Sequence, residues 1–380
     1  MLSRSAWMSG KAGVMMHYLP PCPEGRDGSR FETVDACVEC FNIPAFLEQF
    51  DRIGAEWLIF TIGQNTGMYN APCEVIEKLA GPGHCAKRDL VGELALALHR
   101  AGKHFIAYLP MEAHANPIRR QLGWIPDSPE HPVSPQRAFQ KNWLEVVAEW
   151  SLRYGRLIDG WFFDGGYCLI QTRAERTALF AAARAGNSDA AVSLNYGGFD
   201  IWDVPLIFED EDYFSGEATM LKNGLPLAHW RDRSTLTAGE LGLPASEGAH
   251  PVSQPYCPGR ASVPGFPGVL MHALVPVDSF WYRKADVAWL KDHPDSRYLQ
   301  NAAAVLPKGE MEFPMYSEAE LAGLLYAFTS VGGAVTLNLG CFADGSFGCE
   351  TRDTVVKAFQ RTFSKKLYRK QQNGSMDYPY

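Results

Sequence analysis

The chain has 380 residues, of which 46 % are hydrophobic and 21 % are charged, so it holds enough apolar side chains for a large folded core. Intrinsic disorder and low-complexity architectures are excluded, because its 35 glycines and 25 prolines occur without a period. The formal net charge of −8 argues against a general nucleic-acid binder, which needs a basic surface to replace counterions. No run of 18 apolar residues occurs, and no membrane span is expected.

The N-terminal segment lacks both an uninterrupted apolar stretch and a small-residue cleavage site. We therefore expect a cytoplasmic chain, or a secreted one whose signal peptide is absent from this sequence. The cysteine count of nine is odd, and only Cys37 and Cys40 stand at CxxC spacing, which favours reduced thiols over a structural zinc. No HExxH, P-loop or nucleotide fingerprint occurs, so we predict no metal and no other cofactor.

Short apolar runs alternate with helical patterns along the chain. Strands are predicted at 12–18, 57–63, 104–110, 160–166, 190–196, 206–210, 268–274 with 279–282, and 334–340. Helices are predicted between most of them, at 44–55, 89–102, 140–155, 173–186 and 317–333. Residues 221–268 are rich in Pro, Gly and Ser, and we expect a long excursion there.

About eight β units joined by helices indicate a parallel sheet, since β-α-β crossovers are right-handed. Eight is also the number that closes a (β/α)8 TIM-like barrel, and this α/β fold class is our prediction. A doubly wound open sheet is the competing architecture. It would place a Gly-rich phosphate turn after the first strand, and GxGxxG is absent.

Polar and aromatic side chains stand at the predicted strand ends, where the reacting groups of such a barrel lie. They are His17 and Tyr18, Gln64 and Asn65, Tyr108, Asp164, Asn195 and Tyr196, the acidic run 209–212 with Glu217, Trp281 and Asn338. Aromatic faces pack on the C–H surfaces of sugars, while amides and carboxylates pair with hydroxyl groups. This lining predicts a carbohydrate partner.

Asp164 stands at the end of a buried strand, where a carboxylate has little solvation unless partners are supplied. It could cap the next helix or bind a loop amide, or it could be a nucleophile that attacks an anomeric carbon. A nucleophile needs a second carboxyl as general acid and base, and Glu217 is the first candidate. Glu209 and Glu211 are the reserve acids, although an acidic run usually forms a solvated turn.

Six segments match, in order, the pattern of a known family. They are Trp7 with KAGVMMH, DLVGELALALHRAGKHFIAYLP, NWLEVVAEWSLRYGRLIDGWFFDGG, DYFSGE, SFWY and ELAGLLYAFTSVGGAVTLNLGCFADGSF. Over roughly residues 7–345 the chain resembles the α-L-fucosidases of glycoside hydrolase family 29. The resemblance implies a retaining enzyme on a (β/α)8-like barrel, with Asp164 as nucleophile, Glu217 as acid/base and His17 against the sugar.

The sequence departs from the family at the residues that select the sugar. Where the family ends its second strand with Lys-His-His-Asp-Gly, this chain has Gly-Gln-Asn-Thr-Gly over 63–67. Gln64 and Asn65 can hydrogen-bond hydroxyl groups but cannot carry a proton or a charge. The family's Arg near the fifth strand is replaced by the region of Asn195 and Tyr196. We expect one catalytic domain over 1–345, without the family's C-terminal β-sandwich, followed by a helix and polar tail over 346–380.

We predict a retaining exo-glycoside hydrolase that cleaves a terminal α-linked deoxy-sugar through a covalent glycosyl ester of Asp164, with Glu217 as acid/base. The predicted sugar-binding residues are His17, Gln64, Asn65, Tyr108, Asn195 and Trp281. Two alternatives stay open: a glycosidase of the same fold with another sugar or endo specificity, and a non-catalytic carbohydrate-binding protein. The expected partner is an oligosaccharide or glycoconjugate, and a homo-oligomer is left open.

Overall fold

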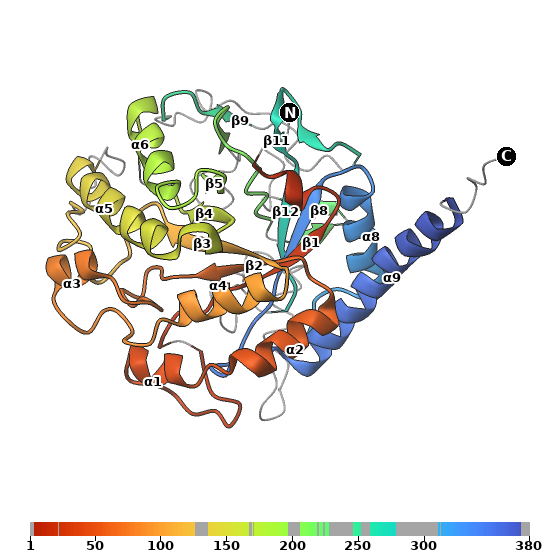
Figure 1. Ribbon diagram of the computed structural model, residues 1–380, viewed down its shortest axis with the longest axis horizontal. Helices are drawn as coiled ribbons and strands as arrows, with labels where there is room; N and C mark the ends of the chain where they lie inside the picture. Colours follow the sequence, from red (N-terminus) through yellow and green to blue (C-terminus); the bar gives the residue numbers. More distant parts are fainter. Residues whose placement is uncertain are drawn as a thin grey trace.

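The computed structural model describes residues 4–21, 23–125, 136–166, 169, 171–196, 206–218, 220–222, 225–227, 246–251, 259–278, 311 and 313–373 (Figure 1). The predicted strand at 279–282, with Trp281, lies outside these residues.

Seven parallel strands form a curled sheet at the centre of the molecule. In sheet order they are β12 (His272–Pro276), β13 (Ala334–Asn338), β1 (Ala12–Met16), β2 (Trp57–Thr61), β3 (His104–Pro110), β4 (Gly160–Asp164) and β5 (Ala191–Asn195). Nearly all of their residues are buried, as expected for strands covered on both faces. The predicted parallel α/β sheet is confirmed.

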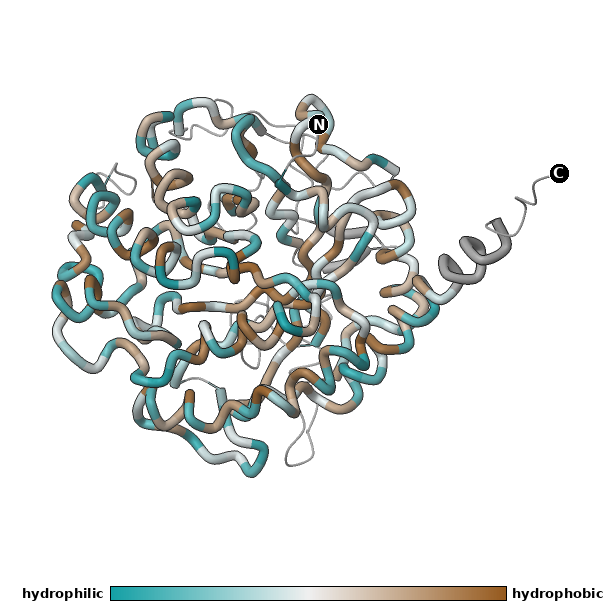
Figure 2. Tube along the Cα trace, in the orientation of Figure 1, coloured by the Kyte–Doolittle hydropathy of each residue, from teal (hydrophilic) through white to brown (hydrophobic). Residues whose placement is uncertain are grey.

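Alternate residues of each strand enter two separate apolar clusters. Ile59, Ile106 and Phe162 belong to a small cluster on one face of the sheet. The intervening residues, such as Phe60 and Ala107, join a larger cluster that includes the buried faces of the helices. Figure 2 shows the hydrophobic stretches concentrated in the strands at the centre of the molecule. The smaller cluster thus lies on the face that the helices leave uncovered, beneath the carboxyl ends of the strands.

Helices follow the strands much as the hydrophobic periodicity predicts. They are α2 (Ile43–Ile53), α4 (Leu90–Arg100), α5 (Arg137–Tyr154), α6 (Arg173–Ala183) and α8 (Glu318–Thr329). Thr172 and Ser317 begin α6 and α8 with reciprocal capping boxes. The short helices α1 (Val34–Glu39) and α3 (Glu74–Ala80), and the 3-10 turns η1 (Ala6–Met8) and η2 (Gly155–Leu157), were not predicted.

The last helix, α9 (Cys349–Asn373), lies against α8 and α2 (Figure 1). The hydroxyl of Thr362 donates to the carbonyl of Ala322 on α8, and Phe359 is buried in the core. No helix in the ranges given above is both long enough and apolar enough to cross a bilayer.

The predicted strand at 206–210 is present only in part, and it does not join the main sheet. β6 contains only Leu206–Ile207 and pairs antiparallel with β9 (His250–Pro251), outside the main sheet. The Glu211 carboxylate is the physical reason, because it accepts hydrogen bonds from the backbone N–H groups of Phe208 and Leu194. These bonds turn the chain and hold it against β5.

The following segment, 212–218, makes backbone hydrogen bonds to both edges of the sheet. The N–H of Asp212 donates to Val192 of β5 at 2.9 Å. The N–H of Ala218 donates to Leu274 of β12, also at 2.9 Å. The remaining short strands lie in the excursion: β7 (Met220–Lys222) pairs with β8 (Leu225–Leu227), and β10 (Ser262–Val263) with β11 (Phe266–Leu270). The closed eight-stranded barrel stays a prediction.

Candidate active site

Strand register brings Asp164 and Asn195 together. Each is the last residue of its strand, and the two are direct partners in the pairing of β4 with β5. Tyr108 of β3 pairs with Phe162, and their rings stack with centroids 5.8 Å apart. Since side chains two residues apart share a face of a strand, the Tyr108 phenol lies on the same face as Asp164.

Donors surround the Asp164 carboxylate. Its Oδ1 accepts from Asn195 Nδ2 at 2.6 Å, and its Oδ2 accepts from Gln64 Nε2 at 3.0 Å and from the Tyr108 hydroxyl. The backbone of Gly165 supplies a further bond. Asp164 does not cap α6, because Thr172 does so. These donors come from the ends of three strands and the loop after β2, and all of them stabilise the ionised form.

Glu217 reaches the same cluster from segment 212–218. Its Oε2 accepts from Nδ2 of Asn195, the nitrogen that also donates to Asp164. Gly216 makes this approach possible, since it has φ +66° and a Cβ there would lie 2.1 Å from the carbonyl oxygen of His272. The Glu217 side chain is only 7 % exposed. The buried carboxyl group of Glu217 and the half-buried one of Asp164 thus flank one amide.

The surroundings of Asp164 and Glu217 act differently on the pKa values of the two carboxyl groups. Burial raises the pKa of both, and for Glu217 the nearby Asp164 charge adds to the effect and brings its pKa to about 8. Hydrogen bonds from Tyr108, Asn195, Gly165 and Gln64 counteract the rise at Asp164, whereas at Glu217 a hydrogen bond from Asn195 does so. At neutral pH the arrangement therefore favours an ionised Asp164 beside a protonated Glu217.

The structure brings most of the predicted sugar-binding residues to these strand ends. The rings of His17 and Tyr108 pack edge to face with their centroids 4.8 Å apart. Burial lowers the pKa of His17 to about 3, so its imidazole is neutral. Gln64 donates to both Tyr108 and Asp164. Asn65 is half-buried on the loop after β2, next to Gln64. Trp281 lies outside the described residues.

Asn116 supports the site and was missed at the sequence level. It is fully buried in the loop after β3, and its amide donates to the backbone carbonyl of Gln64 at 3.3 Å. It also donates to the Tyr69 hydroxyl at 3.4 Å. Only its place after a strand end could have drawn attention to it, because no motif surrounds it.

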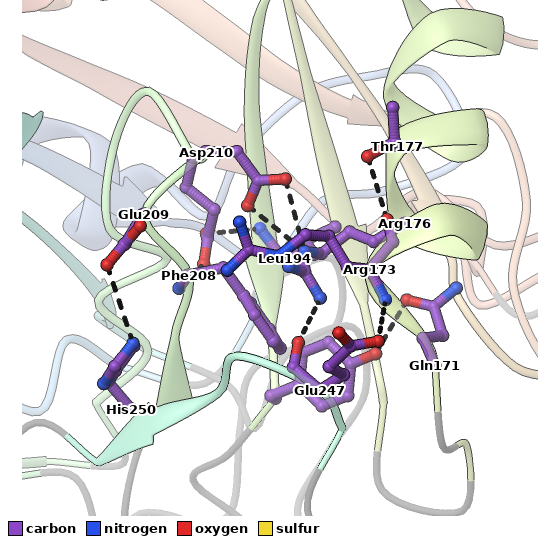
Figure 3. Close-up of polar contacts among 12 residues, drawn as sticks. Gln171, Arg173, Arg176, Thr177, Leu194, Phe208, Glu209, Asp210, Glu247 and His250 are labelled. Carbon is purple, nitrogen blue, oxygen red and sulfur yellow. Dashed lines mark hydrogen bonds and ion pairs between the residues drawn. The ribbon is translucent and has the colours of Figure 1, made fainter.

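Neither reserve acid belongs to the cluster, which corrects that prediction. Figure 3 shows the neighbourhood of the acidic run, in which Glu209 reaches His250 and Asp210 reaches Arg176. Glu209 is 66 % exposed at the surface, with His250 at 4.0 Å. Glu211 is occupied by the backbone N–H groups of Phe208 and Leu194. Asp210 between them forms an ion pair with buried Arg176 on α6. The acidic run therefore holds the chain in place, and the acid of this segment that lies beside Asp164 and Asn195 is Glu217.

Comparison with known proteins rests on the fold. No protein-family model and no curated protein sequence matches the chain. The chain has the fold of several solved glycoside hydrolases. The endo-fucoidan hydrolase MfFcnA4 of glycoside hydrolase family 107 matches with a TM-score of 0.60 at 16 % identity, over 95 % of this chain and 53 % of that one.

A second member of family 107, the endo-fucoidan hydrolase P5AFcnA, matches with a TM-score of 0.58 at 14 % identity, over 99 % of this chain and 95 % of its own. The alpha-L-fucosidase AlfC, in complex with Fuca(1,6)GlcNAc, matches with a TM-score of 0.53 at 13 % identity, over 96 % and 99 %. The chain thus spans about half the length of MfFcnA4 and nearly all of the other two. At these sequence identities the matches show a shared fold, and the activity has to be argued from the residues of the site.

Proposed function

We propose that the protein is a retaining glycoside hydrolase that acts on a fucose-like α-linked deoxy-sugar. One observation carries the proposal: a single buried amide, Asn195, bridges the carboxyl groups of Asp164 and Glu217. The two oxygens that share this nitrogen can be no more than about 6 Å apart, since each hydrogen bond spans at most about 3 Å. Retaining glycosidases hold their carboxyl groups roughly 5–5.5 Å apart, and inverting ones about 6.5–9.5 Å.

An ionised Asp164 can act as the nucleophile, and a protonated Glu217 can act as the general acid. In the first step the Asp164 carboxylate attacks the anomeric carbon, and the bond to the leaving oxygen breaks as Glu217 protonates that oxygen. A glycosyl ester of Asp164 results. In the second step a water molecule attacks the anomeric carbon and gives a proton to the Glu217 carboxylate. The bond between the anomeric carbon and Asp164 breaks in the same displacement, which releases the sugar and restores the Asp164 carboxylate.

Neutral hydrogen-bonding groups around the pair fit a sugar ring. His17, Gln64, Asn65 and Tyr108 would contact hydroxyl groups, and we assign Trp281 to the same pocket on the sequence pattern alone. We also propose that segment 212–218 closes the sheet into a (β/α)8 barrel over residues 1–345. Its hydrogen bonds to β5 and β12 support this closure.

Fucose specificity is supported by two kinds of similarity. The sequence resembles the α-L-fucosidases of family 29, and the solved structures with this fold include an alpha-L-fucosidase and endo-fucoidan hydrolases. The same endo-fucoidan hydrolases favour a second candidate function, endo cleavage within a fucose-containing polysaccharide. Product length separates the two, because an exo enzyme releases single sugars and an endo enzyme releases oligosaccharides.

The test compares the wild type with Asp164→Ala on 4-nitrophenyl α-L-fucopyranoside and other aryl glycosides. We expect loss of activity by at least about 10³-fold, and azide should restore it while giving a glycosyl azide of inverted configuration. Glu209→Gln, which changes an exposed acid, is the control and should retain activity. Full activity of Asp164→Ala would refute the proposal, and sugar binding by an inactive wild type would favour the non-catalytic alternative.

A further inference from the structure

Asn195 occupies an unusual position for a buried amide. It is the last residue of β5, is 1 % exposed, and directs one nitrogen at two carboxyl groups. The orientation of the amide follows from chemistry, because its oxygen in the same place would face acceptors on both sides. Each of the two N–H bonds therefore serves one carboxyl group.

We propose that Asn195 is a positioning residue that keeps Asp164 and Glu217 from sharing a proton and fixes the acid proton of Glu217 on Oε1. This inference rests on the proposed glycosidase function and concerns how the same pair works. Oε2 of Glu217 accepts from the amide, and in a protonated carboxyl group the carbonyl oxygen is a better acceptor than the hydroxyl oxygen. The amide therefore favours the carbonyl form at Oε2 and the proton on Oε1, where it can be given to a leaving group.

Without the amide, Oδ1 of Asp164 and Oε2 of Glu217 would face each other with nothing between them. Two carboxyl groups in direct contact share one proton, and their two apparent pKa values move apart. A nucleophile that shares a proton attacks poorly, so the pair would lose its division of roles. The amide donates to both groups and thereby keeps the nucleophile ionised.

The other groups around the pair cannot take over this task. On β3, Tyr108 donates to Oδ2 of Asp164, and Gln64 after β2 donates to the same oxygen. Directly after β1, His17 is neutral and lies against the Tyr108 ring. None of these contacts lies between the two carboxyl groups. Among the residues that the structure describes, only Asn195 donates to both of them.

The first test is the pH profile of kcat/KM for Asn195→Ala on the aryl glycoside that the wild type cleaves best. We expect the rate to fall at least about tenfold and the basic limb to move up by roughly one pH unit or more. Ser193→Ala is the matched control, two residues earlier on β5 with its hydroxyl on Glu211. A lower rate with both limbs unmoved would show a merely structural role and overturn the inference.

A second variant keeps the shape of the side chain. In Asn195→Asp the introduced carboxyl can donate only when it is protonated, so we expect the pH optimum to move down by roughly one unit or more. An unchanged optimum would contradict the inference, even where Asn195→Ala fails to fold.

A direct titration separates this inference from the proposed function. The pKa of Glu217 is measured by ¹³C NMR of carboxyl-labelled protein, which needs no activity. We expect a higher pKa for Glu217 in Asn195→Ala than in the wild type and in Ser193→Ala, and an unchanged value overturns the inference. If Asp164→Ala stays fully active, the proposed function fails, while this titration still decides whether the amide separates the two carboxyl groups.

Discussion

Tyr108→Phe isolates one of the donors that hold Asp164 in its ionised form. The substitution removes the hydroxyl that donates to Oδ2, but it keeps the ring that stacks on Phe162 at 5.8 Å and contacts His17 at 4.8 Å. A hydrogen bond to a charged group contributes about 1.5–3 kcal/mol, which corresponds to roughly one to two pKa units. The Asp164 pKa should rise by that amount.

In the proposed mechanism Asp164 must be ionised to attack, so its pKa should set the acid limb of the activity profile. For Tyr108→Phe we expect the acid limb of kcat/KM to move up by about one to two pH units, with a smaller loss of rate above it. Tyr213→Phe is the control, since its hydroxyl donates to the backbone of Trp161 and has no contact with Asp164. An acid limb that moves equally in both variants, or in neither, would refute the reasoning.

Three further predictions follow from the same contacts. Wild-type activity should fall as pH rises through about 8, because Glu217, with its raised pKa, is protonated only below that pH. Glu217→Gln should lose most of the activity, and any residual activity should not fall at this pH. Gly216→Ala should lower the free energy of unfolding in urea by at least about 3 kcal/mol, since the added Cβ would overlap a carbonyl oxygen of β12. Gly54→Ala, with open space around the added Cβ, should lower it by only about 1 kcal/mol. Arg176→Met should lower the free energy of unfolding by about 2 kcal/mol, because it breaks an ion pair with Asp210 in which the Arg side chain is buried. Arg361→Met, at an exposed ion pair, should lower it by under about 0.5 kcal/mol, and equal losses in the two variants would contradict the prediction.

Much of the site could be predicted from the sequence because parallel strands present their carboxyl ends at one edge. Asp164 and Asn195 close two neighbouring apolar runs, and register alone makes them partners. Glu217 could be selected from the family resemblance, and Gly216 beside it explains why that segment can approach β12.

The parts that could not be predicted depend on single side chains that override local patterns. The run at 206–210 has the composition of a strand, but the Glu211 carboxylate binds two backbone N–H groups and ends it after Ile207. Gln64 and Asn65 stand where the family has histidines, and this replacement gave no sign that Gln64 would donate to Asp164. Loop residues such as Asn116 follow no periodicity, so their contacts emerge only from the folded chain.

The most direct test of the central claim is mass spectrometry of the protein after incubation with a 2-deoxy-2-fluoro-α-L-fucosyl donor that has a good leaving group. Such a donor forms the glycosyl ester but slows its hydrolysis. The account predicts one added fluorosugar on the peptide that contains Asp164, and none on the Asp164→Ala variant. Turnover of the aryl fucoside with the label on another residue, or with the first-formed sugar in the inverted configuration, would contradict it.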